Sequence, residues 1–131
     1  MASITGSKYE FVHRAIILYW ATNCNRASYL TQSELEFLKY YYVGYNERYF
    51  RSNRFLTRKD DDELVGRIKQ RIPRADKLRQ TVEDKKWIHT YNDTVMIPQR
   101  LMFRGKYVLK IQQFELVYQE KDQGAAGSGE G

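Results

Sequence analysis

Residues 64–88, LVGRIKQRIPRADKLRQTVEDKKWI, contain the pattern that decides the fold of this chain. Two sets of apolar residues have helical spacing and a third is typical of a strand: Leu64, Val65 and Ile68; Ala75, Leu78 and Val82; Trp87 and Ile88. The stretch predicts a helix over about residues 60–70, a tight turn, and a second helix from Pro73 to about Asp84. Pro73 suits the first turn of a helix, where its missing N–H is not needed. This is the pattern of a helix-turn-helix followed by a β-strand.

The same stretch holds most of the chain's positive charge. From Arg67 to Lys86 there are eight basic and three acidic residues, a net charge of +5, whereas the whole chain has a net charge of +6. A charge excess concentrated on one element is expected of a surface that binds phosphates. The alternative is a solvated face rich in lysine and arginine. The charge favours nucleic acid as the partner.

The length of 131 residues suits one domain with a single core. We expect that domain to span residues 1–118, and residues 119–131 (QEKDQGAAGSGEG) to form a disordered tail, because they are rich in glycine and lack aromatic residues. Eleven tyrosines and six phenylalanines are an unusually high aromatic content. They indicate a core and half-exposed surfaces built from tyrosine, or alternatively stacking on bases or on a partner.

Helical signals precede residue 64. Apolar residues at helical spacing predict a helix over 9–22, and the Thr31–Glu34 pair has the spacing of a capping box at the start of a second helix. We expect this second helix to end at Gly44, while residues 45–56 either prolong it or form a loop. A further capping signal, Thr57 with Asp60, starts the helix that precedes the turn.

Strand signals follow residue 86. Trp87–Tyr91 and Thr94–Ile97 flank the pair Asn92-Asp93, whose residue types tolerate the positive φ of a tight two-residue turn, so we predict a β-hairpin. Residues 101–118 fit both strand and helix periods poorly, and we favour strand.

The residue pattern gives little support to an enzyme or to a cofactor. There is no glycine-rich phosphate loop, no paired-histidine metal motif and no nucleophile motif, and a single cysteine, Cys24, excludes an internal disulfide and a cysteine-based zinc site. The acidic run Asp60–Glu63 is more typical of a helix N-terminus than of a metal site. No signal peptide or membrane-spanning run is visible. We therefore expect a cytoplasmic, non-enzymatic basic protein that binds no cofactor or metal.

Residues 30–97 resemble the winged helix-turn-helix domains of the MarR-like kind. The resemblance lies in the apolar faces of the two helices, in Lys85-Lys86-Trp87-Ile88 as the crossing into a wing, and in the capped helix that starts at Thr31. It implies a mainly α fold with a small β-hairpin wing, in which the helix over 73–84 reads the major groove of duplex DNA, commonly as a homodimer. Lys86 stands where a glycine is usual, so it would have to adopt that glycine's backbone geometry or shift it.

The predicted function is that of a small transcription regulator that binds DNA. Whether it is of viral or mobile-element origin is left open. On the helix over 73–84, Lys77 and Gln80 lie opposite the apolar face with Arg74 and Thr81 at its edges, which suits base edges in the major groove. Flanking cations would hold phosphates. The predicted DNA-binding residues are Arg71, Arg74, Lys77, Arg79, Gln80, Thr81, Lys85 and Lys86.

The alternative is a winged-helix module for protein–protein interaction or assembly, because fold alone does not fix function. Residues 40–50 are rich in tyrosine, a residue type enriched at the centres of interfaces. The predicted interface residues are Tyr41, Tyr45, Tyr49 and Phe50.

Overall fold

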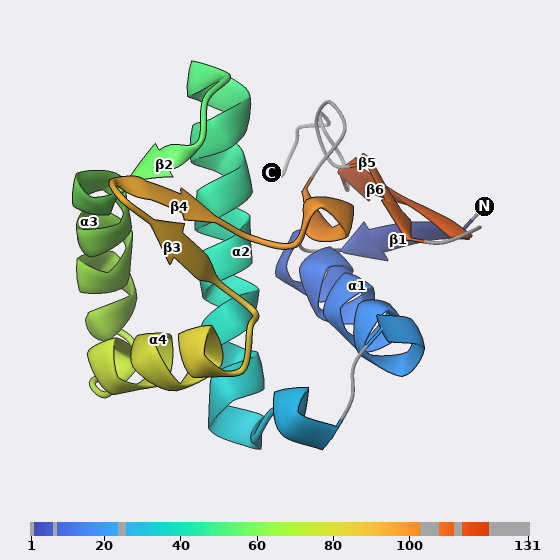
Figure 1. Ribbon diagram of the computed structural model, residues 1–131. Coiled ribbons are helices and arrows are strands. Elements are labelled where there is room, and N and C mark those ends of the chain that lie inside the picture. The colour runs from blue at the N-terminus through green and yellow to red at the C-terminus, as the bar shows by residue number, and fades with distance from the viewer. Residues whose placement is uncertain (1, 7, 24–25, 103–107, 112–113, 121–131) are drawn as a thin grey trace.

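The computed structural model describes residues 2–6, 8–23, 26–102, 108–111 and 114–120, and it is mainly helical (Figure 1). Its four helices and two 3-10 turns are α1 (Lys8–Asn23), η1 (Arg26–Ser28), α2 (Gln32–Ser52), α3 (Arg58–Lys69), α4 (Ala75–Asp84) and η2 (Gln99–Leu101). Its strands are β1 (Ala2–Gly6), β2 (Leu56–Thr57), β3 (His89–Tyr91), β4 (Thr94–Met96), β5 (Val108–Ile111) and β6 (Phe114–Glu120). No helix among these residues is long and apolar enough to cross a membrane.

The long helix α2 stands at the centre of the molecule (Figure 1). On one side of it lie α3, α4 and a small antiparallel sheet with strand order β2-β4-β3. On the other side lies α1 with a second sheet, β1-β6-β5, in which β1 is parallel and β5 antiparallel to β6. Both faces of α2 are therefore covered.

The helix α2 begins as predicted and ends later than predicted. Thr31 and Glu34 form the expected capping box, but the helix continues through Gly44 to Ser52, and Asn53 ends it in the left-handed region with φ 57°. The prediction that the helix ends at Gly44 was therefore wrong. Gly44 is there for close packing instead, because a Cβ at this position would overlap the side chain of Leu64 on α3.

The core confirms the predicted apolar faces of α3 and α4. Leu64, Ile68, Leu78, Val82 and Trp87 are all buried in one cluster. The first helix is also confirmed, since α1 spans Lys8–Asn23 and contributes four fully buried residues, Phe11, Val12, Ala15 and Ile16.

The ends of α3 and α4 follow local signals. Thr57 and Asp60 form a second capping box at the start of α3, which spans 58–69 against the predicted 60–70. The helix α4 begins at Ala75 rather than at Pro73, because the backbone of Arg74 is already outside helical geometry, with φ −93° and ψ 21°. Pro73 thus belongs to the turn between the helices.

The predicted hairpin is confirmed. Tyr91 pairs with Thr94, and Asn92 takes the positive φ of the turn, 55°. The sheet has a third strand that the sequence did not predict, β2, whose Leu56 pairs with Val95. A strand of two residues is too short to show the alternation of apolar and polar residues that marks a strand in a sequence.

The C-terminal strands agree with the preference for strand over 101–118, since β5 and β6 lie there. The strand β6 runs to Glu120, two residues into the predicted tail, because it pairs with β1 as far as Gly6. The rest of that tail, 121–131, lies outside the described residues. The strand β1 was not predicted.

Candidate nucleic-acid interface

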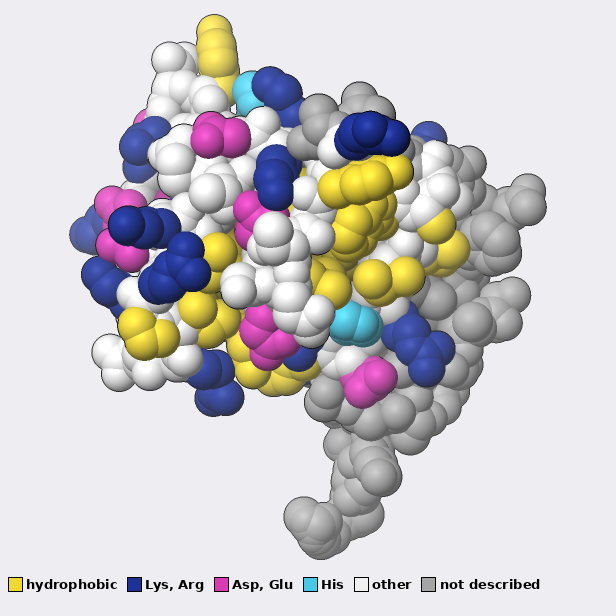
Figure 2. Space-filling model, turned by 90° about the horizontal axis from the view of Figure 1, so that it is seen from below, with side chains coloured by type: hydrophobic (Ala, Val, Ile, Leu, Met, Phe, Trp, Pro, Cys, Tyr) yellow, Lys and Arg dark blue, Asp and Glu magenta, His cyan; other side chains and the backbone are white. Residues whose placement is uncertain are grey.

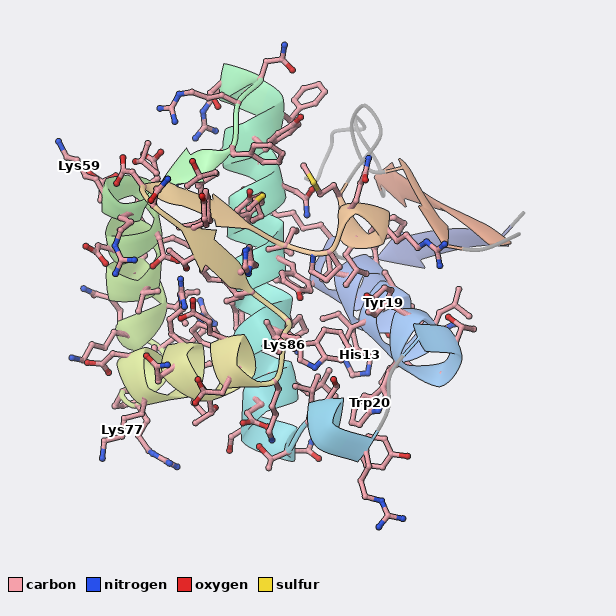
Figure 3. All side chains as sticks on the ribbon, in the orientation of Figure 1. His13, Tyr19, Trp20, Lys59, Lys77 and Lys86 are labelled. Atoms are coloured by element: carbon pink, nitrogen blue, oxygen red, sulfur yellow. The ribbon has the colours of Figure 1, made fainter. Side chains whose placement is uncertain are left out.

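The helix α4 places one polar face toward solvent. Its residues Ala75, Leu78 and Val82 are buried, so Lys77, Gln80 and Thr81 are left exposed. In Figure 3, Lys77 points away from the body of the molecule, at the end of α4 next to the turn. Arg74, the residue before α4, is also exposed. These are four of the predicted DNA-binding residues, and the fold brings them onto one element.

Lys86 ends α4 in a glycine-like conformation. Its φ is 73°, its N–H donates to the Glu83 carbonyl at 2.9 Å, and the Trp87 N–H donates to the Val82 carbonyl at 2.9 Å. These two bonds define a Schellman motif, in which a glycine usually occupies the left-handed position. Lys86 does adopt that geometry, and its side chain is exposed. The cation therefore stands between α4 and the hairpin (Figure 3).

Arg79 is turned inward instead. Its guanidinium donates to Asp61 at 3.0 Å, to Glu83 at 2.7 Å and to the Thr90 hydroxyl at 3.1 Å, and its side chain is 12% exposed. The Tyr41 hydroxyl donates to the same Asp61 carboxylate. Burial alone would lower the pKa of Arg79, but the charge of Asp61 raises it above its usual range. Its charge thus joins α2, α3, α4 and β3 rather than facing a ligand.

Lys85 is also committed to an internal contact. Its Nζ donates to Glu34 at 2.6 Å, and the Glu34 side chain, 5% exposed, also accepts from the Thr31 backbone N–H at 2.8 Å. Burial alone would raise the pKa of Glu34, yet hydrogen bonds from Lys85, Thr81 and the Thr31 backbone hold it below its ordinary value. Lys85 therefore ties the end of α4 to the start of α2.

Arg71 points toward α2. Its guanidinium lies over the Tyr40 ring at 5.1 Å, and it lines a pocket with Arg67 and Tyr9 on that side of the molecule.

The predicted DNA-binding set thus separates into three groups by contact. Those facing outward along α4 are Arg74, Lys77, Gln80, Thr81 and Lys86; those in internal ion pairs are Arg79 and Lys85; and Arg71 faces α2.

The outward face of α4 is of mixed charge. The helix itself contains two cations, Lys77 and Arg79, and three acids, Asp76, Glu83 and Asp84, a net charge of −1. Asp76 accepts from Lys69 at 3.0 Å, which lowers its pKa, and Asp84 accepts from Gln80 at 3.0 Å. Figure 2 shows Lys and Arg side chains gathered on the left, over the end where α3 and α4 meet, with acidic side chains near them.

The tip of the hairpin presents an aromatic ring. Tyr91 is 65% exposed, and Asn92 and Asp93 beside it are exposed as well. The tip itself contains no lysine or arginine, so it offers no cation for insertion into a minor groove.

Two of the four predicted interface residues are core residues, so that part of the prediction was wrong. Tyr41 and Tyr45 have 0% exposure, because the apolar face of α2 continues through Gly44 and buries their rings. The Tyr45 hydroxyl donates to the Val95 carbonyl at 2.6 Å, and burial raises its pKa to about 12. Tyr49 is half-buried against Phe55, while Phe50 is 54% exposed.

The acidic run at the start of α3 has internal partners. Asp60 caps the helix and pairs with Arg54 at 3.1 Å, and Asp61 is held by Arg79 and Tyr41. Across the described part of the chain, no group of three or more His, Cys, Asp or Glu side chains is arranged to hold a metal ion.

Comparison with protein-family models, with curated proteins and with solved structures finds no match for this chain. The class that the fold itself defines is a mainly helical protein with a small antiparallel sheet beside a pair of short helices.

Proposed function

We propose that this protein binds duplex DNA as a winged helix-turn-helix regulator, with α4 in the major groove. The observation that carries the proposal is the exposed polar face of α4, on which Lys77 and Gln80 lie opposite the buried apolar face, with Arg74 and Thr81 exposed at its edges. Arginine and lysine suit the acceptors of guanine, and glutamine suits adenine.

The arrangement of the elements supports this proposal. A helix (α2), a short strand (β2), two helices joined by a tight turn (α3 and α4) and a hairpin (β3 and β4) follow one another, and β4 lies between the other two strands. This order is the one expected of a winged helix-turn-helix, in which the hairpin follows the second helix of the pair. The resemblance to MarR-like domains further implies a homodimer, which remains a prediction.

The strained conformation of Lys86 also supports it. A non-glycine residue with positive φ costs about 1–2 kcal/mol relative to the usual helical geometry. Such strain is expected where a side chain is needed for function. A lysine at this crossing lies beside both α4 and the hairpin, where a phosphate of the DNA backbone would pass.

The charges that face outward predict a modest dependence on salt. Arg74, Lys77 and Lys86 are the outward-facing cations of the proposed interface, whereas Asp76 and Asp84 on the same helix repel phosphates. Bringing these three cations to the DNA neutralises about three phosphate charges, whether a cation contacts a base edge or a phosphate, and gives a slope of about −3 in a plot of log affinity against log salt. Base contacts would then supply most of the specificity.

The proposal is tested by fluorescence anisotropy with a random pool of labelled duplexes, repeated at several salt concentrations, followed by selection of the tightest sequences. We expect binding that weakens with that slope and a selected sequence that binds at least about a thousandfold more tightly than the pool. No binding to duplex at low salt would contradict the proposal. It would favour the alternative, a protein-interaction module whose exposed aromatic residue on α2 is Phe50.

A further inference from the structure

A pocket of about 190 Å³ lies where the start of α1, the middle of α2 and the end of α3 meet. Its floor is apolar and is made by Val43, Leu64 and Ile68, which are buried. Gly44 allows this floor to form, because a side chain at that position would displace Leu64. None of its lining residues belongs to α4, since they come from α1, α2, α3 and the turn after α3.

Three arginines surround this apolar floor. Arg48 comes from α2, Arg67 from α3, and Arg71 from the turn after α3, and we call this site the arginine pocket. The only acidic residue among its lining residues is Glu47, which is paired with Lys8. No carboxylate in the described part of the chain forms an ion pair with any of the three arginines. Three arginines against one carboxylate, which is itself paired with Lys8, give the concave surface a net positive charge.

Two of the arginines are held in place, Arg71 by an aromatic ring and Arg48 by the backbone of α2. Tyr9 and Tyr40 are in contact, with 5.0 Å between ring centroids, and the guanidinium of Arg71 lies over Tyr40 at 5.1 Å. Arg48 is anchored by a hydrogen bond to the Gly44 carbonyl at 3.3 Å. Stacking fixes the plane of a guanidinium while leaving its N–H edge available. These edges match the oxygens of a tetrahedral anion, which arginine binds in a bidentate manner.

We propose that the arginine pocket binds the phosphate group of a phosphomonoester, with Arg67 and Arg71 as the principal ligands and Arg48 as the third. Low-dielectric apolar walls beneath convergent charges favour a dianion over chloride. The Tyr9 and Tyr40 rings form a wall against which the organic part of such a ligand can pack. This site is separate from the proposed DNA surface, because none of its lining residues belongs to α4.

The probes distinguish a phosphomonoester from the phosphodiesters of a nucleic-acid backbone. The full-length protein is titrated by calorimetry with inorganic phosphate, with adenosine monophosphate and, separately, with a short duplex, all at matched ionic strength in chloride. We expect saturable one-to-one binding of phosphate and of the monophosphate. Absence of binding by both at millimolar concentration would overturn the proposal.

The double variant R67Q/R71Q removes the two principal cations, and R14Q/R51Q is the matched control, since both of its arginines are exposed and lie outside the pocket. Losing two hydrogen bonds to a charged group predicts affinity for the monophosphate that is roughly 100-fold lower in R67Q/R71Q. The affinity of the control for the monophosphate should be within about twofold of that of the unaltered protein, because the control keeps the three pocket arginines. It changes the net charge by the same amount as R67Q/R71Q, so a long-range charge effect would appear in both variants. Circular dichroism and thermal unfolding show whether both variants fold.

Equal losses in the two variants would mean a non-specific charge effect and would overturn the proposal. Duplex binding that falls in R67Q/R71Q, together with no phosphate binding by the unaltered protein, would assign these arginines to the DNA backbone and would also overturn it. The proposed function is tested on other residues, so either conclusion can fail while the other holds.

Discussion

The cations around α4 fall into two groups within the same twelve residues, and the two groups have different surroundings. Arg79 and Lys85 are turned inward and are bound to carboxylates on α2, α3 and α4, whereas Arg74 and Lys77 project into solvent. Counted along the sequence, all four contribute equally to the net charge of the stretch. The comparison shows that the net charge of a segment overstates the charge on its surface. Cations that form internal ion pairs do not contribute to the surface potential.

The largest expected effect comes from the inward group. Arg79→Ala would leave Asp61 buried without its charged partner, and removing one member of a buried ion pair costs about 3–5 kcal/mol of the free energy of unfolding. The outward Arg74→Ala should change that free energy by less than about 0.5 kcal/mol, as exposed substitutions do. Urea unfolding of both variants makes the comparison. Equal stabilities would show that the Arg79 network does not hold the fold together.

The sequence analysis predicted the helices and the hairpin because their signals are local. Capping residues, an apolar period and a two-residue turn each lie within a few residues of the element that they specify. The partners of Arg79 and Lys85 are not local in this sense, since Asp61 is 18 residues away and Glu34 is 51 residues away. No pattern in the sequence marks those pairs, so both residues were assigned to DNA.

A pattern in the sequence could have prevented the two errors on α2, which are its end at Gly44 and the interface role of Tyr41 and Tyr45. Buried positions at Phe37, Leu38, Tyr41, Tyr42 and Tyr45 continue one helical face past Gly44, and that continuity predicts core tyrosines better than an interface. The arginine pocket had no such signal, because Arg48 and Arg67 are brought together only by the packing of α2 against α3.

Lys85 and Glu34 predict how acid affects stability. The pKa of Glu34 is lowered in the folded protein, so its ion pair stabilises the fold fully above its ordinary pKa of 4.5 and loses this contribution as the pH falls further. We expect Lys85→Ala to cost about 1–2 kcal/mol at pH 7. The ion pair with Glu34 takes the place of the phosphate contact that the sequence predicted for Lys85.

Glu34→Gln should remove part of the loss of stability below pH 4.5. Thermal unfolding of Glu34→Gln and of the unaltered protein from pH 7 to pH 3 measures the difference. Parallel curves for the two proteins would show that the pair contributes nothing.

Two glycines give a paired test of a packed and an exposed helix surface. Gly44→Ala inserts a Cβ into Leu64, and overpacking of this kind costs about 1–3 kcal/mol. Gly66→Ala, on the exposed side of α3, meets nothing within 4 Å and should stabilise the protein by about 0.5–1 kcal/mol, because alanine favours helix. Opposite shifts in melting temperature are expected. A stabilising Gly44→Ala would mean that α2 and α3 are not packed closely there.

A small effect on stability is expected at Lys86. Replacing this lysine by glycine relieves a positive φ of 73° and should stabilise the protein by up to about 1 kcal/mol. If the lysine is kept for a phosphate contact, Lys86→Gly should at the same time weaken duplex binding several-fold and reduce the salt slope by about one. A more stable variant with unchanged DNA affinity would remove Lys86 from the proposed interface.

The most direct test of DNA binding by α4 is the affinity of R74A/K77A for the selected duplex, measured beside R14A/R51A as a control of equal charge. All four arginine and lysine side chains are exposed, so both variants should fold, and circular dichroism checks this. We predict that R74A/K77A loses specific binding, by about 100-fold or more, because each well-placed base contact contributes about 1–3 kcal/mol. The control should keep its preference for the selected sequence. A folded R74A/K77A that binds the selected duplex as tightly as the unaltered protein would contradict the proposal that α4 reads DNA.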